Sequence, residues 1–109
     1  MSVKIDVTGE VVTAYLIGDI DHHTAQEMRE NIDNAIELNM PTLLILDFKD
    51  VSFMDSSGIG LVMGRYRTLA KTRAELHIMN APPQIFKILK LAGIEKLAKL
   101  GGYSNEGKK

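Results

Sequence analysis

The chain has 109 residues, of which 45% are hydrophobic and 25% are charged, and its formal net charge at pH 7 is −1. This balance predicts one globular domain with a modest core, and the near-zero charge gives no reason to expect nucleic acid or an anionic membrane as a partner. The absence of cysteine excludes disulfides, thiolate metal sites and cysteine catalysis. Residues 1–6 contain no apolar signal region, and no apolar run approaches the roughly 18 residues of a spanning helix. We therefore expect a soluble, cytoplasmic protein.

Two strands are predicted at the start of the chain. Val3, Ile5 and Val7 alternate with polar residues, which predicts a strand with one buried face. Gly9-Glu10 fits a tight turn, and the β-rich residues 11–17 predict a second, more buried strand. Because the predicted turn is short, these two strands can pair as an antiparallel hairpin.

The first helix is expected to begin at Thr24. Thr24 and Glu27 fit a capping box, in which Thr24 is the N-cap and Glu27 reaches back to it. The helix should end before Pro41, because a residue that precedes proline avoids the α region. Its apolar residues recur at helical spacing and predict the buried face, which consists of Ala25, Met28, Ile32, Ala35 and Ile36.

A strongly apolar strand and a second helix are predicted in the middle of the chain. Residues 42–48 include four consecutive aliphatic residues, 43–46, which suits a strand that is covered on both faces. The second helix is expected at about residues 57–71. Its predicted buried stripe consists of Ile59, Val62, Met63, Tyr66, Leu69 and Ala70.

The last third of the chain predicts a short strand, a third helix and a tail. The strand covers residues 75–79, Pro82-Pro83 suits a helix start, and Gly93 stands where a C′ glycine belongs. Residues 94–100 fit either a strand or one helical turn, and residues 101–109 predict a flexible tail. The order β-β-α-β-α-β-α predicts a single α/β domain over residues 1–109, with a mixed, mostly parallel sheet of four or five strands. The order of strands within the sheet does not follow from this pattern.

Two segments follow the carboxyl ends of predicted strands, where open α/β sheets gather their functional sites. Residues 18–23 follow the second strand and include Asp21, His22 and His23. Residues 51–57 follow the third strand. If the two strands are parallel, both segments emerge at one edge of the sheet, and the first group lies near Asp55, Ser56 and Ser57.

The residues Asp55, Ser56, Ser57 and Gly58 form a polar turn at the predicted start of the second helix. All four residue types are favoured in caps and turns, so a purely structural role remains open. Ser57 fits the cap and Ser56 the exposed hydroxyl, which could be phosphorylated or act as a nucleophile. The unpaired N–H groups and partial positive charge of a helix N-terminus favour a phosphate there.

The second helix carries a further signal opposite its predicted buried stripe, where Ser57, Gly60, Leu61 and Gly64 share one face. Glycine inside a helix costs about 1 kcal/mol relative to alanine. Two glycines four residues apart therefore need a reason, and one reason is the close approach of another backbone to this face. Leu61 is expected to be an exposed apolar anchor between them. The face is either a docking surface for another protein or an internal packing surface.

Three enzymatic or ligand-binding alternatives use the same segments. A hydrolase would recruit Ser56, a neighbouring histidine and Asp21 or Asp55, but the nucleophile elbow Gly-x-Ser-x-Gly is absent. A dinucleotide site is weakly indicated, because Gly64 comes one place late for the Gly-x-Gly-x-x-Gly pattern and the Walker lysine is missing. A sensor that binds a small anion or a nucleotide at the helix end needs neither motif and remains open.

A metal site is not supported by the sequence. Asp21, His22 and His23 lack a His-x-x-x-His or cysteine-pair pattern. The third histidine, His77, falls in a predicted strand, where a structural or exposed role is expected.

Two segments resemble a known family. The sequence SFMDSSGIG at residues 52–60, followed by MGRYR at residues 63–67, resembles the signature of bacterial anti-sigma-factor antagonists, which are single STAS domains. The sequence GDIDHHTA at residues 18–25 resembles the sporulation sigma-F type in particular. The similarity covers roughly residues 3–97. Members of this type commonly continue into a last helix, whereas residues 101–109 here are polar and contain glycine.

The resemblance implies a five-stranded sheet with helices packed on it, and a regulatory partner. That partner is an anti-sigma factor that is also a serine kinase; the unphosphorylated antagonist binds it and frees the sigma factor. The kinase phosphorylates the first serine after the aspartate, which is Ser56 here, and a serine phosphatase of the PP2C type reverses the switch. The domain itself would catalyse nothing, bind no cofactor or metal, and leave ATP and magnesium to the kinase. The residues expected to contact the partner are Asp21, His22, His23, Asp55, Ser57, Gly58, Gly60, Leu61 and Gly64.

Overall fold

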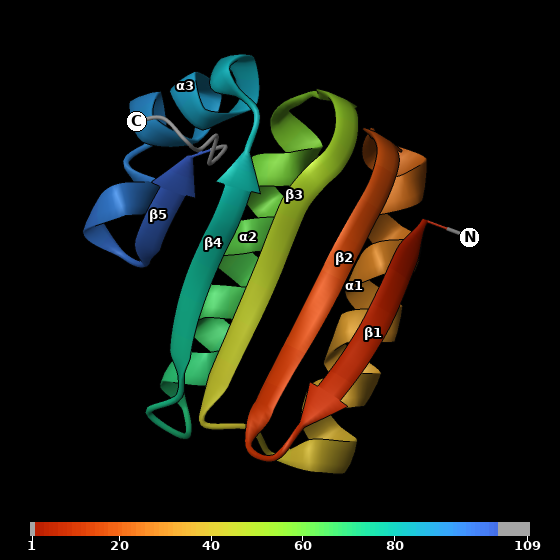
Figure 1. Ribbon diagram of the computed structural model, residues 1–109, viewed down its shortest axis with the longest axis vertical. Coiled ribbons are helices and arrows are strands. Elements are labelled where there is room, and N and C mark those ends of the chain that lie inside the picture. Colours follow the sequence, from red (N-terminus) through yellow and green to blue (C-terminus); the bar gives the residue numbers. More distant parts are fainter. Residues whose placement is uncertain (1, 103–109) are drawn as a thin grey trace.

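The computed structural model describes residues 2–102, which form a five-stranded sheet with helices packed on it (Figure 1). The strands lie in the order β1-β2-β3-β4-β5; β1 is antiparallel to β2, and all other neighbours are parallel. The predicted α/β class, mixed sheet and opening hairpin are therefore confirmed. The elements are β1 (Val3–Thr8), β2 (Val11–Ile20), α1 (His22–Asn39), β3 (Leu43–Met54), α2 (Ser56–Ala70), β4 (Glu75–Ala81), α3 (Pro83–Leu91), the 3-10 turn η1 (Ile94–Lys96) and β5 (Lys99–Gly102).

The core lies between the sheet and the two long helices, which cover the same face of the sheet. In Figure 1, α1 lies behind β1 and β2, and α2 lies behind β3 and β4. Ala14, Leu46 and Ile78 stand side by side on neighbouring strands, and all three are buried. Met28 and Ile32 of α1 are fully buried as well. Each such large aliphatic side chain stabilises the fold by about 1.5–3 kcal/mol through loss of apolar surface from water.

The start of α1 differs from the prediction. The N-cap is Asp21 rather than Thr24: an Asp21 carboxylate oxygen accepts from the Thr24 amide at 2.9 Å, and the Thr24 hydroxyl accepts from the Asp21 amide at 2.9 Å. The capping box therefore forms three residues earlier, because β2 continues to Ile20 and leaves only Asp21 between strand and helix. His22 and His23 consequently belong to the first turn of α1 and not to a loop. The end of α1 at Asn39, before Pro41, is as predicted.

Strand β3 is longer than the predicted residues 42–48. It continues to Met54 because β2, its parallel neighbour, pairs with it as far as Ile20 opposite Met54. Charged residues at 49 and 50 interrupt the apolar run, which is why the extension was not visible in the sequence. The expected loop at residues 51–57 is thereby reduced to Asp55.

The buried face of α2 also differs from the predicted stripe. Val62 and Leu69 are buried as expected, but Ala70 is exposed and Ile59, Met63 and Tyr66 are only partly buried. The helix packs against α1 as well as against the sheet, so its buried arc is wider and turned toward α1. The buried residues of α2 are Gly58, Leu61, Val62, Arg65 and Leu69.

The ambiguous residues 94–100 form both predicted structures, the turn η1 followed by the start of β5. Gly93 has φ +82° and follows the C-cap Ala92, which confirms the predicted C′ glycine. Gly101 and Gly102 belong to β5, so the expected tail is wrong for these two residues. The rest of that expected tail, residues 103–109, lies outside the described residues. No helix in the described part of the chain has the length and apolar character needed to cross a membrane.

Candidate functional site

The ends of β2 and β3 bring the two predicted segments together. Ile20 is opposite Met54 in the sheet, and the Asp55 amide donates to the Ile20 carbonyl at 3.1 Å. Asp21 and Asp55 are the next residues along each strand, and each is the N-cap of the helix that follows. The prediction that these segments meet at one edge of the sheet is therefore confirmed.

The two capping carboxylates hold their helix ends by hydrogen bonds to backbone amides. The carboxylate of Asp55 accepts from the Ser57 amide at 2.8 Å, so Asp55, and not Ser57, caps α2. At the start of α1, the hydrogen bond from the Thr24 amide lowers the pKa of Asp21. The Thr24 hydroxyl and the nearby His23 lower it further. Each cap satisfies one of the amides that a helix start leaves unpaired.

Ser56 is the first residue of α2, and its side chain is exposed, whereas Ser57 is half-buried. Ser56 therefore presents a solvent-accessible hydroxyl at the N-terminus of α2, directly after the capping residue Asp55. Among residues 2–102, no hydrogen bond joins this hydroxyl to His22 or His23. The relay that a serine hydrolase would need is not assembled.

The glycines of α2 differ in what surrounds them. A Cβ at Gly58 would overlap the side chain of Met54 at the end of β3, so Met54 would have to move to admit one. A Cβ at Gly60 or Gly64 would meet nothing within 4 Å. No backbone of the described chain packs against these two glycines, so the internal close approach that they indicated is absent. For Gly60 and Gly64 a docking role stays a prediction, while Leu61 between them is buried.

Leu61 is not the exposed anchor that the sequence predicted. Its side chain is only 4% exposed, because α2 turns this position toward α1. Leu61 instead forms part of the floor of a groove between the two helices. The groove has a volume of about 390 Å³, and it is lined by His22, Ala25, Gln26 and Arg29 of α1 and by Ser57, Gly60, Leu61, Gly64, Arg65 and Arg67 of α2. These residues form the α1–α2 groove.

Three arginines of the groove were not identified from the sequence. They share the helical spacing of residues that were identified, since Arg67 follows Gly64 by three positions, Arg65 follows Leu61 by four and Arg29 follows His22 by seven. That spacing was the available signal.

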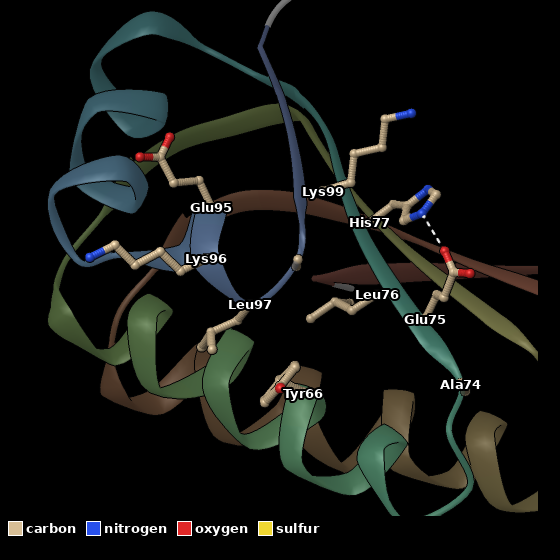
Figure 2. A pocket seen from close by; sticks show the side chains of 10 residues that line it. Tyr66, Ala74, Glu75, Leu76, His77, Glu95, Lys96, Leu97 and Lys99 are labelled. Carbon is tan, nitrogen blue, oxygen red and sulfur yellow. Dashed lines mark hydrogen bonds and ion pairs between the residues drawn. The ribbon is translucent and has the colours of Figure 1, made fainter.

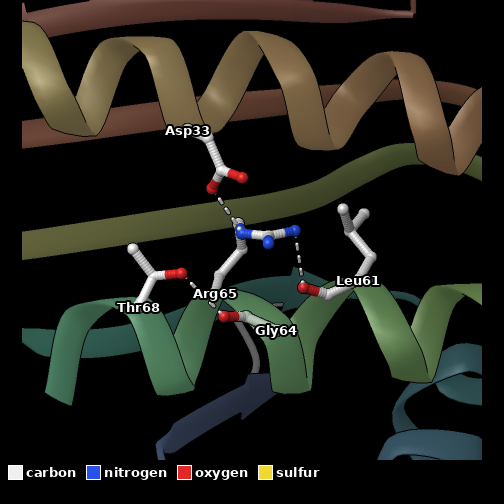
Figure 3. A network of polar contacts seen from close by, with 5 residues as sticks. All are labelled: Asp33, Leu61, Gly64, Arg65 and Thr68. Carbon is white, nitrogen blue, oxygen red and sulfur yellow. Dashed lines mark hydrogen bonds and ion pairs between the residues drawn. The ribbon is translucent and has the colours of Figure 1, made fainter. Parts of the chain in front are cut away.

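Arg65 of α2 forms an ion pair with Asp33 of α1 and so links the two helices (Figure 3). Its side chain is 6% exposed, and its Nε lies 2.8 Å from a carboxylate oxygen of Asp33 in an ion pair that lacks the alignment of a directional hydrogen bond. Its Nη1 also donates to the Leu61 carbonyl at 3.4 Å. Burial lowers the pKa of Arg65, Asp33 opposes the shift, and the nearby charges of Arg29 and Arg67 reinforce it.

A second hollow, of about 580 Å³, lies away from the serine edge, between α2, β4, η1 and β5 (Figure 2). Tyr66 and Leu97 line it, and the Nε2 of His77 lies 3.1 Å from a carboxylate oxygen of Glu75. His77 is a half-buried residue of β4, as the predicted strand placed it. Within residues 2–102, no group of three His, Asp or Glu side chains is placed to hold a metal ion.

Comparison with known proteins identifies the family. The model of the STAS domain family matches residues 2–106, which is nearly the whole chain. The chain belongs to the STAS family. This STAS domain is 38% identical over 88 residues to the anti-sigma F factor antagonist of Lysinibacillus sphaericus, a match that covers 81% of this chain and 75% of the relative. It is 32% identical over 96 residues to the anti-sigma F factor antagonist of Paenibacillus polymyxa, which covers 88% and 80%.

Two solved structures of SpoIIAA are similar to this STAS domain. The structure of the anti-sigma factor antagonist SpoIIAA in its unphosphorylated form matches with a TM-score of 0.79 and 33% identity, over 95% of this chain and 89% of that chain. The structure of the Bacillus cell fate determinant SpoIIAA in the phosphorylated form matches with a TM-score of 0.73, also at 33% identity, over 95% and 92%. The family and the fold that the two sequence segments predicted are confirmed.

Proposed function

We propose that this STAS domain is an anti-sigma-factor antagonist that is switched by phosphorylation of Ser56. In this proposal the unphosphorylated domain binds an anti-sigma factor that is also a serine kinase, and the sigma factor is released. Phosphorylation of Ser56 abolishes the binding, and a serine phosphatase of the PP2C type restores it. ATP and magnesium act in the kinase and not in this domain.

The observation that carries the proposal is the position of Ser56. Its exposed hydroxyl stands at the start of α2, next to a groove whose two interior glycines have no internal packing role. A kinase can reach this hydroxyl without unfolding any part of the domain. The relatives named above are anti-sigma factor antagonists, and SpoIIAA is known in both an unphosphorylated and a phosphorylated form.

The switch acts through charge at the binding surface. A phosphate adds about −1.5 to −2 charges at pH 7. The N-terminus of α2 stabilises that charge locally, while the carboxylates of Asp21 and Asp55 oppose it. A partner that covers Ser56 must strip water from the phosphate, and a thousandfold loss of affinity requires about 4 kcal/mol. One badly placed buried charge exceeds this amount, so no change of fold is needed.

The test uses the cognate anti-sigma kinase, which the genes next to this one would identify. The purified domain is incubated with the kinase and ATP, and the phosphate is mapped by mass spectrometry. Phosphate on Ser56, its loss in Ser56→Ala and its retention in the neighbouring control Ser57→Ala are expected. Phosphate on another residue, or equal binding of the kinase to the phosphorylated and unphosphorylated domain, contradicts the proposal. Direct phosphorylation weighs more than the mimic Ser56→Asp, which carries less charge.

A further inference from the structure

The α1–α2 groove is strongly cationic in a chain whose net charge is −1. Its lining contains Arg29, Arg65 and Arg67 and no carboxylate. Arg65 is paired with Asp33, which contacts it from outside the lining. Arg29 and Arg67 are exposed and form no ion pair within the described residues. Two unpaired positive charges therefore border this groove beside a third that is buried.

The three arginines act on one another. The charges of Arg29 and Arg67 both lower the pKa of Arg65, so each lies close enough for repulsion to be felt. Asp33 acts on the pKa of Arg65 more strongly than either arginine does, but its ion pair is with Arg65 and leaves Arg29 and Arg67 without one in the described part of the chain. Like charges gathered on one surface are an unfavourable arrangement for an isolated domain. A negatively charged occupant would remove this cost.

The shape of the groove favours a segment of chain over a single small anion. On α2 its lining runs from Ser57 to Arg67, which is about 15 Å along a helix at 1.5 Å per residue. An extended peptide of about four or five residues covers that length. Between the charges, Gly60, Leu61 and Gly64 form a smooth, partly apolar floor with open space above both glycines. Such a floor suits a backbone with small side chains, whereas a phosphate contacts only one end of it.

We propose that the α1–α2 groove binds an acidic segment of the protein partner, and that Arg29 and Arg67 are its specificity-determining contacts. This inference rests on the proposed function, since the partner is taken to be the anti-sigma factor. It also explains why a phosphate at Ser56 opposes binding. Ser57 lines the groove, so a phosphate on the preceding residue places negative charge at the end of a cationic site that an acidic segment must enter.

The test is charge reversal on the exposed rim. The variant Arg29→Glu/Arg67→Glu is compared with wild type in binding to the cognate anti-sigma factor, at about 50 and 300 mM NaCl. Lys87→Glu/Lys90→Glu is the control with the same change of net charge, because Lys87 and Lys90 are exposed residues of α3 outside the groove. Arg65 is left unchanged, since its substitution would break the contact with Asp33.

We expect the double variant to associate at least about tenfold more slowly at low salt and to lose most of the salt dependence of the association rate. The control should stay within about threefold of wild type. A hexaglutamate peptide should compete with the anti-sigma factor, and a hexalysine peptide should not. Equal effects of the double variant and the control overturn the inference. Competition by millimolar inorganic phosphate or ATP that matches the peptide also overturns it, because the site would then be one for small anions.

The two proposals fail in different ways. If wild type neither binds the anti-sigma factor nor is phosphorylated at Ser56, the proposed function is refuted and the inference with it. If wild type binds and is phosphorylated but the rim reversals have no effect, only the inference is refuted. Unfolding of each variant is followed by circular dichroism, and a loss of binding counts only for variants that melt within a few degrees of wild type.

Discussion

The glycines of α2 provide the sharpest test of how this helix is used. Gly60 and Gly64 stand in the helix interior, where alanine is favoured over glycine by about 0.8–1 kcal/mol. A methyl group at either position meets nothing within 4 Å, so no steric cost offsets this gain. Gly60→Ala/Gly64→Ala should therefore stabilise the isolated domain by about 1–2 kcal/mol. In a domain of this size, that raises Tm by several degrees, at about 4 °C or more per kcal/mol.

The same substitution at Gly58 should have the opposite effect. There the new methyl group would overlap the side chain of Met54, which is itself buried. Displacing it should destabilise the domain by about 1–3 kcal/mol, the usual cost of overpacking. Three identical substitutions in one helix thus serve as controls for one another.

Thermal and urea unfolding measure the stabilities, and binding to the anti-sigma factor is measured on the same proteins. If the face of α2 that carries Gly60 and Gly64 is a docking surface, Gly60→Ala/Gly64→Ala should bind the anti-sigma factor more weakly than wild type, although it is the more stable protein. Destabilisation by this pair, or a neutral Gly58→Ala, would refute the packing argument. Unchanged affinity in the stabilised variant would refute the docking argument alone.

Three further substitutions test the caps and the helix pair. Asp55→Ala should destabilise the domain by about 0.5–2 kcal/mol, and Ser57→Ala by much less, because Asp55 accepts the capping hydrogen bond; equal losses in chemical denaturation would contradict that assignment. Asp33→Asn should leave the charge of Arg65 largely buried without a counter-charge and destabilise the domain by about 1–3 kcal/mol. This is below the cost for a fully buried pair because Asp33 is partly exposed. Urea unfolding should find that Asp33→Asn destabilises the Arg65→Met variant less than it destabilises wild type. Asp21 has a pKa that is lower in the folded than in the unfolded state, so it stabilises the fold above the unfolded pKa, and this contribution is lost as pH falls through the folded pKa. NMR titration should find the lowered pKa. Asp21→Asn should reduce the dependence of stability on pH in this acidic range.

The sequence located the serine edge because the signals there are local. Polar residues follow two apolar strands, and chain connectivity alone places both strand ends at one edge of a parallel sheet. The same local reasoning misassigned the caps, since Asp, Ser and Thr all cap well. The extent of the strands selected among them: β2 ends at Ile20 and β3 at Met54, so only Asp21 and Asp55 remain between strand and helix.

By itself, the sequence determined the α/β class, the element order and the exposed Ser56, because side-chain periodicity and turn chemistry are properties of neighbouring residues. Only the tertiary structure decided which side of α2 is covered, since that depends on the angle at which α1 packs beside it. This packing buried Leu61, paired Arg65 with Asp33 and assembled Arg29 and Arg67 into one groove. Positive charges on two separate helices become a single site only when the helices are held side by side.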